Sequence, residues 1–452
     1  MQIATTPLQS YLSKIEALRI APSVRQGRIW KLQNRNANGV SWQPYSTTWR
    51  DWSEPLFARQ DSILSWDETA KLAEAVHEAT GADLSFVRGS LLDIAEAFLR
   101  NSESMSANEL VTRLASEIYE LFSAGLPVNF RSFLSGIKIE GSPMKPRADV
   151  TLRSFSVEDW PAHLDPTREL GGVGLMDCSI LEIRGRLPAL GQPFDPFDPK
   201  AYHWQRQLEQ VLRILRFYSV GGVQSIRTHS VPTTLIRIPL HGQFSAGPRH
   251  ASPFAYTLSS VDEESLKAHF EFLNDLPSWK IEDFTSVDIA MERYESAIAS
   301  GKFTEEILLH AIIGIEALLR RRSEGRQRSS RRLALLFELA GLSESAKVRG
   351  LLEAAYRFRN PYVHGEVLEQ PDVNRLQPSL IPLLDCLRIS ILLFLGLGTN
   401  KESILSRIEK AIGTPGRTRS RLENELRGIA RTIQLQSDYT RASPSARAPG
   451  PS

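Results

Sequence analysis

The spacing of apolar residues changes twice along this chain of 452 residues, and these changes limit the folds that it can adopt. Apolar side chains first recur every three or four residues, which is typical of amphipathic helices. Short stretches that alternate with a period of two follow, which is typical of strands. From about Thr285 onward the helical spacing returns. The sequence therefore predicts an α+β fold, in which an N-terminal mixed α/β region is followed by an all-α helical bundle.

The period of each stretch predicts where the individual elements of the mixed region lie. A capping sequence at Ser106–Glu109 begins the last of three early helices, and Gly125 ends it. The three helices are predicted at 67–80, 84–101 and 106–124. Strands are predicted at 134–139, 150–153, 178–187 and 233–238, with a short helix starting at Ser156 and a longer helix at about 200–218. No element is predicted in residues 1–60, which hold four tryptophans but show no period.

The predicted domain boundary lies near Leu276-Pro277-Ser278, where the mixed region ends. Residues 1–276 then form an α+β domain of unknown role, a candidate for recognition or sensing. Residues 277–400 form a helical bundle, and 401–435 form a basic helical extension. The tail 436–452 is rich in Ser, Pro and Ala and is predicted to be disordered.

Composition indicates an ordinary soluble protein of the reducing cytosol. The net charge of +2 is too small to imply a nucleic-acid partner by itself, and the only cysteines, Cys178 and Cys386, lie far apart. The N-terminal residues contain no apolar segment of the signal-peptide type. One long apolar run at 380–397 contains Pro382, and an Asp385–Arg388 pair spaced for contact on a helix. This run is predicted to be a buried bundle helix rather than a membrane span.

The segment Arg359-Asn360-Pro361-Tyr362-Val363-His364 holds the most informative side chains for function. Arginine is permanently charged, and histidine is the side chain that titrates near neutral pH. Proline disfavours a helical conformation in the residue before it, so the preceding helix is expected to end or kink there. Asn360 would then cap a following turn and place Arg359 and His364 at a helix junction. The alternative is a structural helix break, in which Arg359 caps a carbonyl or pairs with an acid.

This segment is one of three that together resemble a known family. The other two are the apolar stretch 308–319, which carries Glu316 among its apolar residues, and the stretch 331–336. On these residues, the region from about Thr285 to Gly398 resembles the HEPN family and within it the ApeA-like branch. The resemblance implies a small helical bundle that pairs into a homodimer and acts as a metal-independent endoribonuclease. It further implies a cytoplasmic role in bacterial antiphage defence.

By resemblance, Arg359 and His364 match the catalytic pair of the family, and Asn360 matches the polar residue that often follows the arginine. The reaction expected from it is attack of the RNA 2′-hydroxyl on the neighbouring phosphate, which leaves 2′,3′-cyclic phosphate and 5′-hydroxyl ends. No metal ligand and no cofactor are predicted, and the remaining histidines form no close ligand pair. Two alternatives stay open: a non-catalytic dimerisation or RNA-binding scaffold, and the toxin of a toxin–antitoxin pair. A phage or regulatory component is a candidate partner of the N-terminal domain.

Two further groups of residues are expected to support this site. Glu316 is expected to orient Arg359 or Arg357, although a simple pair with Arg320 four residues on is an equal alternative. The stretch from 320 to 332 is expected to be a loop between two helices that contacts RNA phosphates. Its arginines are Arg320, Arg321, Arg322, Arg326, Arg328, Arg331 and Arg332. The alternative for this stretch is a solvated connection without a ligand.

Overall fold

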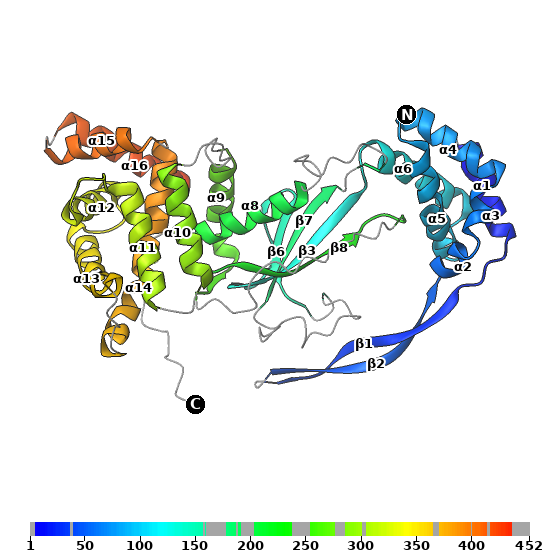
Figure 1. Ribbon diagram of the computed structural model, residues 1–452, viewed down its shortest axis with the longest axis horizontal. Helices are drawn as coiled ribbons and strands as arrows, with labels where there is room; N and C mark the ends of the chain where they lie inside the picture. The colour runs from blue at the N-terminus through cyan, green and yellow to red at the C-terminus, as the bar shows by residue number, and fades with distance from the viewer. Residues whose placement is uncertain are drawn as a thin grey trace.

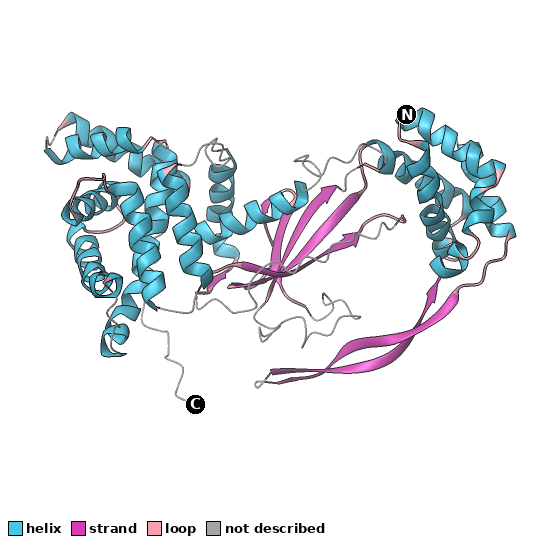
Figure 2. Ribbon diagram, viewed as in Figure 1, coloured by secondary structure: helices cyan, strands magenta, loops and turns pink. Residues whose placement is uncertain are grey.

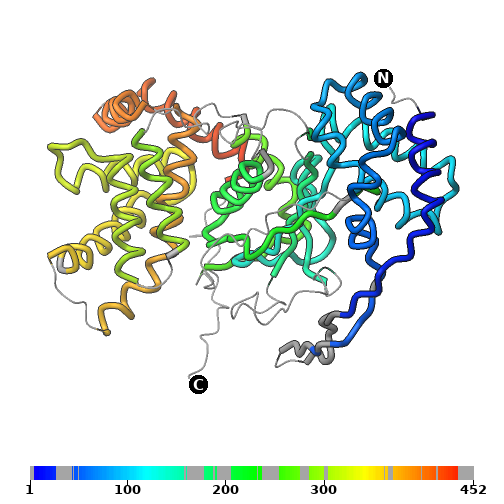
Figure 3. Tube along the Cα trace, turned by 45° about the vertical axis from the view of Figure 1, so that its right-hand side comes forward, coloured from blue at the N-terminus to red at the C-terminus, as the bar shows by residue number. Residues whose placement is uncertain are grey.

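The computed structural model describes most of the chain. The described residues are 5–36, 39–156, 159, 178–186, 189–190, 203–236, 254–275, 285–300, 304–364, 370–398, 400–413 and 416–435. Two helical parts lie at the ends of an elongated molecule, and an antiparallel sheet lies between them (Figures 1 and 3). The α+β fold class predicted from the sequence is confirmed.

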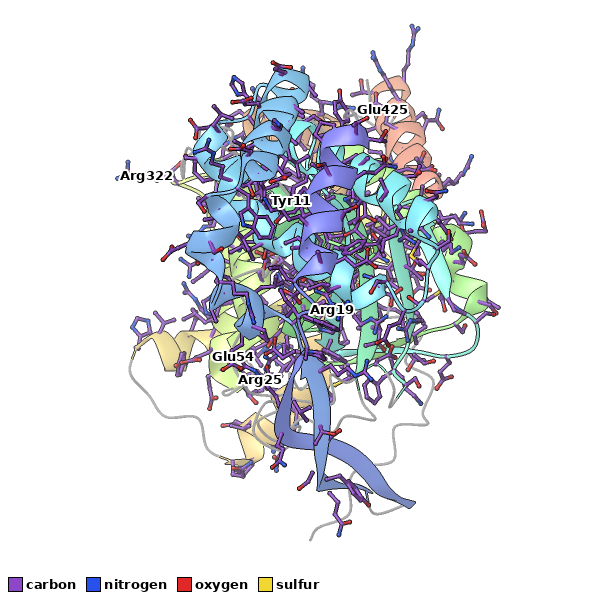
Figure 4. All side chains as sticks on the ribbon, turned by 90° about the vertical axis from the view of Figure 1, so that its right-hand side faces the viewer. Tyr11, Arg19, Arg25, Glu54, Arg322 and Glu425 are labelled. Carbon is purple, nitrogen blue, oxygen red and sulfur yellow. The ribbon has the colours of Figure 1, made fainter. Side chains whose placement is uncertain are left out.

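The N-terminal helical part forms a core of its own. The two predicted helices that precede residue 106 are confirmed at their exact limits as α4 and α5, and the third is confirmed as α6. Ser106 caps α6 by accepting a hydrogen bond from the amide of Glu109. Deep in this part, the buried Tyr11 hydroxyl donates to the Leu91 carbonyl at 2.9 Å (Figure 4). The helices are α1 (Thr5–Ala17), α2 (Ser53–Phe57), α3 (Gln60–Leu64), α4 (Asp67–Thr80), α5 (Leu84–Asn101) and α6 (Ala107–Ser123).

A long antiparallel hairpin extends away from this helical part (Figure 2). It consists of β1 (Ser23–Asn36) and β2 (Gly39–Asp51), and the sequence alone did not predict it. Arg25 joins the two strands at the base through an ion pair with Asp51, and its guanidinium lies 3.6 Å from Glu54 of α2 (Figure 4). The missed prediction has a simple cause: a two-stranded arm has no core-facing side, so its residues need not alternate.

The central sheet has the strand order β5-β6-β7-β3-β8, and α8 (His203–Tyr218) lies across it (Figure 1). The predictions for β6, β7 and α8 are confirmed, and the stretch predicted at 134–139 is divided between β3 and β4 at Gly136. Gly136 has a φ of +77°, and an added Cβ would lie 2.4 Å from the Gly222 carbonyl oxygen, so only glycine fits. The strands are β3 (Pro127–Ser135), β4 (Ile137–Ile139), β5 (Met144–Arg147), β6 (Val150–Ser154), β7 (Ser179–Arg186), β8 (Gln224–Pro232) and β9 (Tyr256–Leu258), the last pairing with β4 in parallel.

The prediction of a strand at 233–238 is wrong for the described residues 233–236, because β8 ends at Pro232. The next amides are used elsewhere: those of Leu235 and Ile236 donate to the buried carboxylate of Glu117 on α6 at 2.8 to 3.0 Å. A side-chain acceptor from another element thus takes the place of a neighbouring strand. Residues 237 and 238 lie outside the described residues. At the helix expected to start at Ser156, the Asp159 amide donates to the Ser156 carbonyl at 3.0 Å and the Ser156 amide donates to the Asp159 carboxylate at 2.9 Å, while residues 157, 158 and 160–177 lie outside the described residues.

The C-terminal bundle surrounds two central helices, α11 and α14. Helix α14 is long and apolar enough to cross a membrane, but 78% of its most apolar window is buried inside the protein, as expected of a core helix. The predicted pair inside it is present, with Arg388 bonded to Asp385 at 2.5 Å. The bundle helices are α10 (Ser286–Ser300), α11 (Thr304–Leu319), α12 (Arg326–Ala340), α13 (Ser345–Val363), α14 (Gln370–Leu397), α15 (Lys401–Gly413) and α16 (Arg417–Thr432), preceded by α9 (Glu263–Asp275).

Sheet and bundle share one continuous cluster of buried apolar side chains, which runs from Val128 in β3 to Ile433 after α16. Arg388 also crosses this region, because its guanidinium donates to the carbonyls of Phe217 and Tyr218 at the end of α8. The predicted boundary at 276–278 and the tail from 436 onward lie outside the described residues. The predicted extension from 401 is helical, and it packs into the bundle through buried residues such as Leu405.

Candidate functional site

The Arg–His segment lies in the last turns of α13, which runs through Pro361 as far as Val363. The His364 amide donates to the Asn360 carbonyl at 3.2 Å, so the helical hydrogen bonding continues past the proline. The predicted helix end before Pro361, with Asn360 as the cap of a new turn, is therefore wrong. The physical reason is tertiary: Leu352 and Ala355 are fully buried and hold α13 against the bundle. One missing amide donor near a helix end does not outweigh that packing.

The continuous helix determines how Arg359 and His364 are placed. Five residues of helix correspond to a rise of ~7.5 Å and a rotation of ~140°. Arg359 is half-buried, and its Nε is a buried atom without a hydrogen-bond partner. His364 is exposed, just beyond the helix end. Within the described residues, Arg359 makes no ion pair, so an unneutralised guanidinium and an exposed imidazole occupy the same end of α13.

Glu316 does not orient Arg359 or Arg357. Its carboxylate accepts hydrogen bonds from Arg320 and from the Tyr356 hydroxyl, both at 2.9 Å. The alternative pair with Arg320 is thus the one present. Burial raises the pKa of Tyr356, which keeps the phenol protonated and able to donate to the carboxylate. Ser329 lies 3.3 Å from the same hydroxyl, so Tyr356 joins α11, α12 and α13 one turn before Arg359.

The arginine-rich stretch is not a single loop, because α12 begins at Arg326. Arg332 is fully buried, and its expected contact with RNA is wrong. Its guanidinium bonds to Glu324 at 2.5 and 2.7 Å, to Glu409 at 2.7 Å and to the Leu319 carbonyl at 2.7 Å. Hydrogen bonding to Arg332 holds the pKa of Glu324 well below its usual range. This arginine had to be buried because it neutralises an acid that the fold encloses.

The other six arginines of the stretch fall into two groups. Arg320, Arg321 and Arg328 are paired with Glu316, Glu402 and Glu324 respectively. Arg322, Arg326 and Arg331 are exposed and make no ion pair in the part of the chain that the structure describes. Figure 4 shows the side chain of Arg322 projecting from the edge of the molecule. The second group is therefore the part of the stretch that is free to bind an anion.

A pocket of about 310 Å³ lies between the start of α12 and the middle of α13. Its lining consists of Arg326, Gln327, Ser330, Glu353, Tyr356 and Arg357. Arg326 lies 5.9 Å from the centre of the Tyr356 ring, in a cation–π contact. The sequence predicted that Arg357 lies near the functional site but did not identify Glu353 and Gln327. The sequence does not show which faces of α12 and α13 are turned toward each other. The spacing of Glu353 and Arg357, one helical turn apart, is the signal that was present.

No family model matches the chain, and no curated protein or solved structure matches it. Among the described residues, no group of three or more His, Cys, Asp or Glu side chains is arranged to hold a metal ion. His310, on the same helix as Glu316, lies 3.5 Å from Arg293, and burial with this neighbouring charge lowers the His310 pKa. Packing against Arg293 therefore accounts for His310.

Proposed function

We propose that this chain is an endoribonuclease that cleaves RNA through Arg359 and His364, and that its helical part is a HEPN-like bundle. The observation that carries the proposal is that Arg359, which makes no ion pair with a described acid, and the exposed His364 lie in the same last turns of α13. A half-buried cation without an acidic partner is costly, and it is stabilised when an anion binds. The phosphodiester backbone of RNA is the anion that such a site fits.

Neighbouring charges support the same conclusion. Arg326 and Arg357 line the pocket beside Tyr356, and Arg359 follows Arg357 by two residues on the same helix. None of the three makes an ion pair with a described acid. Arg326 and Arg357 give the pocket a positive field that attracts a phosphate, and Arg359 adds a third cation further along α13, on another face of the helix. The overall charge of only +2 hides this local concentration.

In the proposed reaction, the 2′-hydroxyl of the substrate attacks the adjacent phosphorus, and the 5′-oxygen leaves. His364 accepts or donates the proton, and Arg359 stabilises the charge that develops on the phosphoryl oxygens. The bond from phosphorus to the 2′-oxygen forms as the bond to the 5′-oxygen breaks. The proton lost by the 2′-hydroxyl is balanced by the proton gained by the leaving 5′-oxygen, so no further reactant is needed. The products are a 2′,3′-cyclic phosphate and a 5′-hydroxyl end.

Acid and base catalysis together need two proton-transfer groups, and each chain supplies one exposed histidine at this end of α13. We infer that a homodimer brings two such ends into one cleft. Val363, beside His364, is 46% exposed, and Ile381 of α14 is 47% exposed, so apolar side chains are available for the contact. Sedimentation should give a dimer at micromolar concentration for the unmodified chain, and Val363→Asp should give a monomer that no longer cleaves. Val261→Asp, at an 86% exposed site elsewhere, is the matched control.

The decisive test is cleavage of a mixed RNA pool by the full chain in EDTA, with analysis of the product ends. His364→Ala should lower the rate by ~10²–10⁴-fold, since that is the usual contribution of a proton-transfer group. Arg359→Ala should lower it by ~10²–10³-fold, and Arg359→Lys should recover little, because a point charge does not replace a planar two-pronged contact. Arg349→Ala, an exposed arginine on the same helix, is the control and should cleave normally.

Cleavage that requires added Mg²⁺, leaves 3′-hydroxyl ends or survives in His364→Ala would overturn the proposed mechanism. One observation favours a second candidate, an RNA-binding bundle that does not cleave: the helical separation of ~140° between Arg359 and His364 within one chain. That candidate predicts binding without cleavage in the same assay. A defence role in bacteria is proposed from the family resemblance alone, and phage plating on cells with the unmodified or His364→Ala chain tests it.

A further inference from the structure

We propose that the pocket between α12 and α13 binds a guanine nucleotide of a single-stranded RNA and so selects where the strand is cut. This inference rests on the proposed function, and it assigns a base specificity to a pocket on the helix that carries Arg359 and His364. The pocket volume of about 310 Å³ is at the lower end of the range for small-molecule sites. It is therefore suited to one nucleotide turned out of a single strand, which is how proteins usually read RNA sequence.

The phosphate of that nucleotide would be held by Arg326 and Arg357. Both guanidiniums line the pocket, and within the described residues neither is neutralised by an acid. Arg326 is the first residue of α12, where the positive end of the helix dipole also favours an anion. The contact with the ring of Tyr356 limits the movement of Arg326, and the buried Tyr356 is itself held by Glu316 and Ser329. The anion-binding wall is thus formed before any ligand arrives.

Glu353 is the residue that distinguishes this pocket from a simple phosphate site. It is exposed at the pocket wall, and it forms no ion pair with Arg357, one turn away, or with another described cation. A carboxylate repels phosphate, so its place beside two arginines points to a ligand with donors as well as an anion. A carboxylate accepts hydrogen bonds at both oxygens. Guanine is the RNA base with two adjacent N–H donors, N1–H and the 2-amino group, on one edge.

The remaining polar side chains fit a base edge in the same way. Gln327 and Ser330 come from the α12 side of the pocket, opposite Glu353 on α13. The Gln327 amide supplies N–H donors that suit the O6 and N7 acceptors of guanine, whereas the Ser330 hydroxyl donates to the Arg326 carbonyl at 3.2 Å and offers only an acceptor. The pocket thus combines two cations, one amide that donates and accepts, and one carboxylate that accepts, which matches a nucleotide more closely than inorganic phosphate.

Binding without cleavage gives the cleanest test, so the His364→Ala full chain is used with labelled oligouridylates. Each oligonucleotide carries one central guanosine, inosine or adenosine, and inosine lacks only the 2-amino donor. The guanosine form should bind roughly tenfold more tightly than the inosine form, since a two-pronged contact with a base gives discrimination of about that order. Glu353→Gln should remove this preference, while Glu344→Gln, an exposed glutamate outside the pocket, should keep it.

The two arginines should act differently from Glu353. Arg326→Gln and Arg357→Gln should weaken binding of all three oligonucleotides alike and reduce the salt dependence, because fewer counterions are released. Equal affinity for the three oligonucleotides, or a preference that survives Glu353→Gln, would overturn the inference. A preference seen only for free guanosine monophosphate, and not within RNA, would also overturn it, because the pocket would then bind a small regulator.

The outcome is separable from that of the proposed function. If the unmodified chain cleaves RNA without enrichment of guanine at a fixed position from the cut, the subsite is wrong and the ribonuclease assignment stands. If guanine-dependent binding is found and no cleavage occurs, the subsite stands and the catalytic proposal fails.

Discussion

At the scale of single residues, arginines that are neighbours in the sequence have unrelated roles. Arg331 is exposed, and Arg332 beside it is fully buried. Glu324 accounts for the difference. Its side chain is only 5% exposed, and it accepts hydrogen bonds from both terminal nitrogens of Arg332. A buried carboxylate needs such a partner, and Arg332 provides it while also bonding Glu409 of α15.

Arg332→Met should destabilise the protein by about 3–5 kcal/mol, because it leaves the enclosed carboxylate of Glu324 without its buried partner and with only the more exposed Arg328 and Arg321 beside it. Arg331→Met, one residue away on the exposed face, should change the stability by less than about 0.5 kcal/mol. Urea denaturation followed by circular dichroism measures both. Equal midpoints for the two variants would show that Arg332 does not carry the enclosed pair.

The same pair makes stability depend on pH. Because the pKa of Glu324 is lower in the folded protein than in the unfolded chain, the charged form favours folding. This contribution is fully present above the ordinary glutamate pKa of ~4.3 and is lost as the pH falls below it. Urea midpoints measured from pH 6 down to about pH 3 should fall less steeply for Glu324→Gln than for the unmodified chain. Parallel pH profiles would contradict this assignment.

At the scale of elements, α13 shows that packing decides where a helix ends. Pro361 lacks the amide that would donate to the Arg357 carbonyl, yet the helix continues to Val363. Helix α14 accommodates Pro378 and Pro382 in the same way. Both helices have buried faces, and the free energy of that burial exceeds the cost of one missing hydrogen bond.

Pro361→Ala should therefore stabilise the protein by about 1–2 kcal/mol, because it restores a donor within a helix that already exists. Cleavage should change by no more than a few fold, since the backbone at Arg359 and His364 is helical with or without the proline. Pro55→Ala is the control, because a proline in the first turn of α2 replaces an amide that has no partner there. If Pro361→Ala abolished cleavage while the protein stayed folded, the proline would be shaping the site after all.

At the scale of the whole molecule, the buried core does not follow the order of secondary structure. The six N-terminal helices enclose one cluster, and the sheet shares a second cluster with the C-terminal bundle. Arg388, in the middle of α14, is fully buried and bonds to carbonyls at the end of α8. The bundle is thus built against the sheet and its covering helix.

A fragment of residues 277–452 should consequently fail to fold as a cooperative unit, because it exposes the apolar face that the sheet region covers and leaves Arg388 without its carbonyl partners. A fragment of residues 127–452, which keeps the second cluster and loses only the N-terminal helices, should fold. Thermal unfolding by circular dichroism and size-exclusion chromatography distinguish the two. A cooperative transition in the shorter fragment would show that the bundle is an independent domain.

The sequence by itself determined the elements whose periodicity is strong and local. Helices α4 and α5, strands β6 and β7, and the Asp385–Arg388 pair follow from the spacing of neighbouring residues, because periods of 3.6 and 2.0 are properties of the backbone. It also identified the Arg359–His364 segment, on which the functional proposal rests.

Only the tertiary structure decided which charged side chains are buried or paired and which are exposed. The burial of Arg332, the pairing of Glu316 with Arg320 and Tyr356, and the course of α13 through Pro361 all depend on residues distant in the chain. The pocket that brings Glu353 close to Arg326 depends on them as well. The physical reason is that burial and ion pairing are set by what packs against a residue, and spacing along one helix does not contain that information.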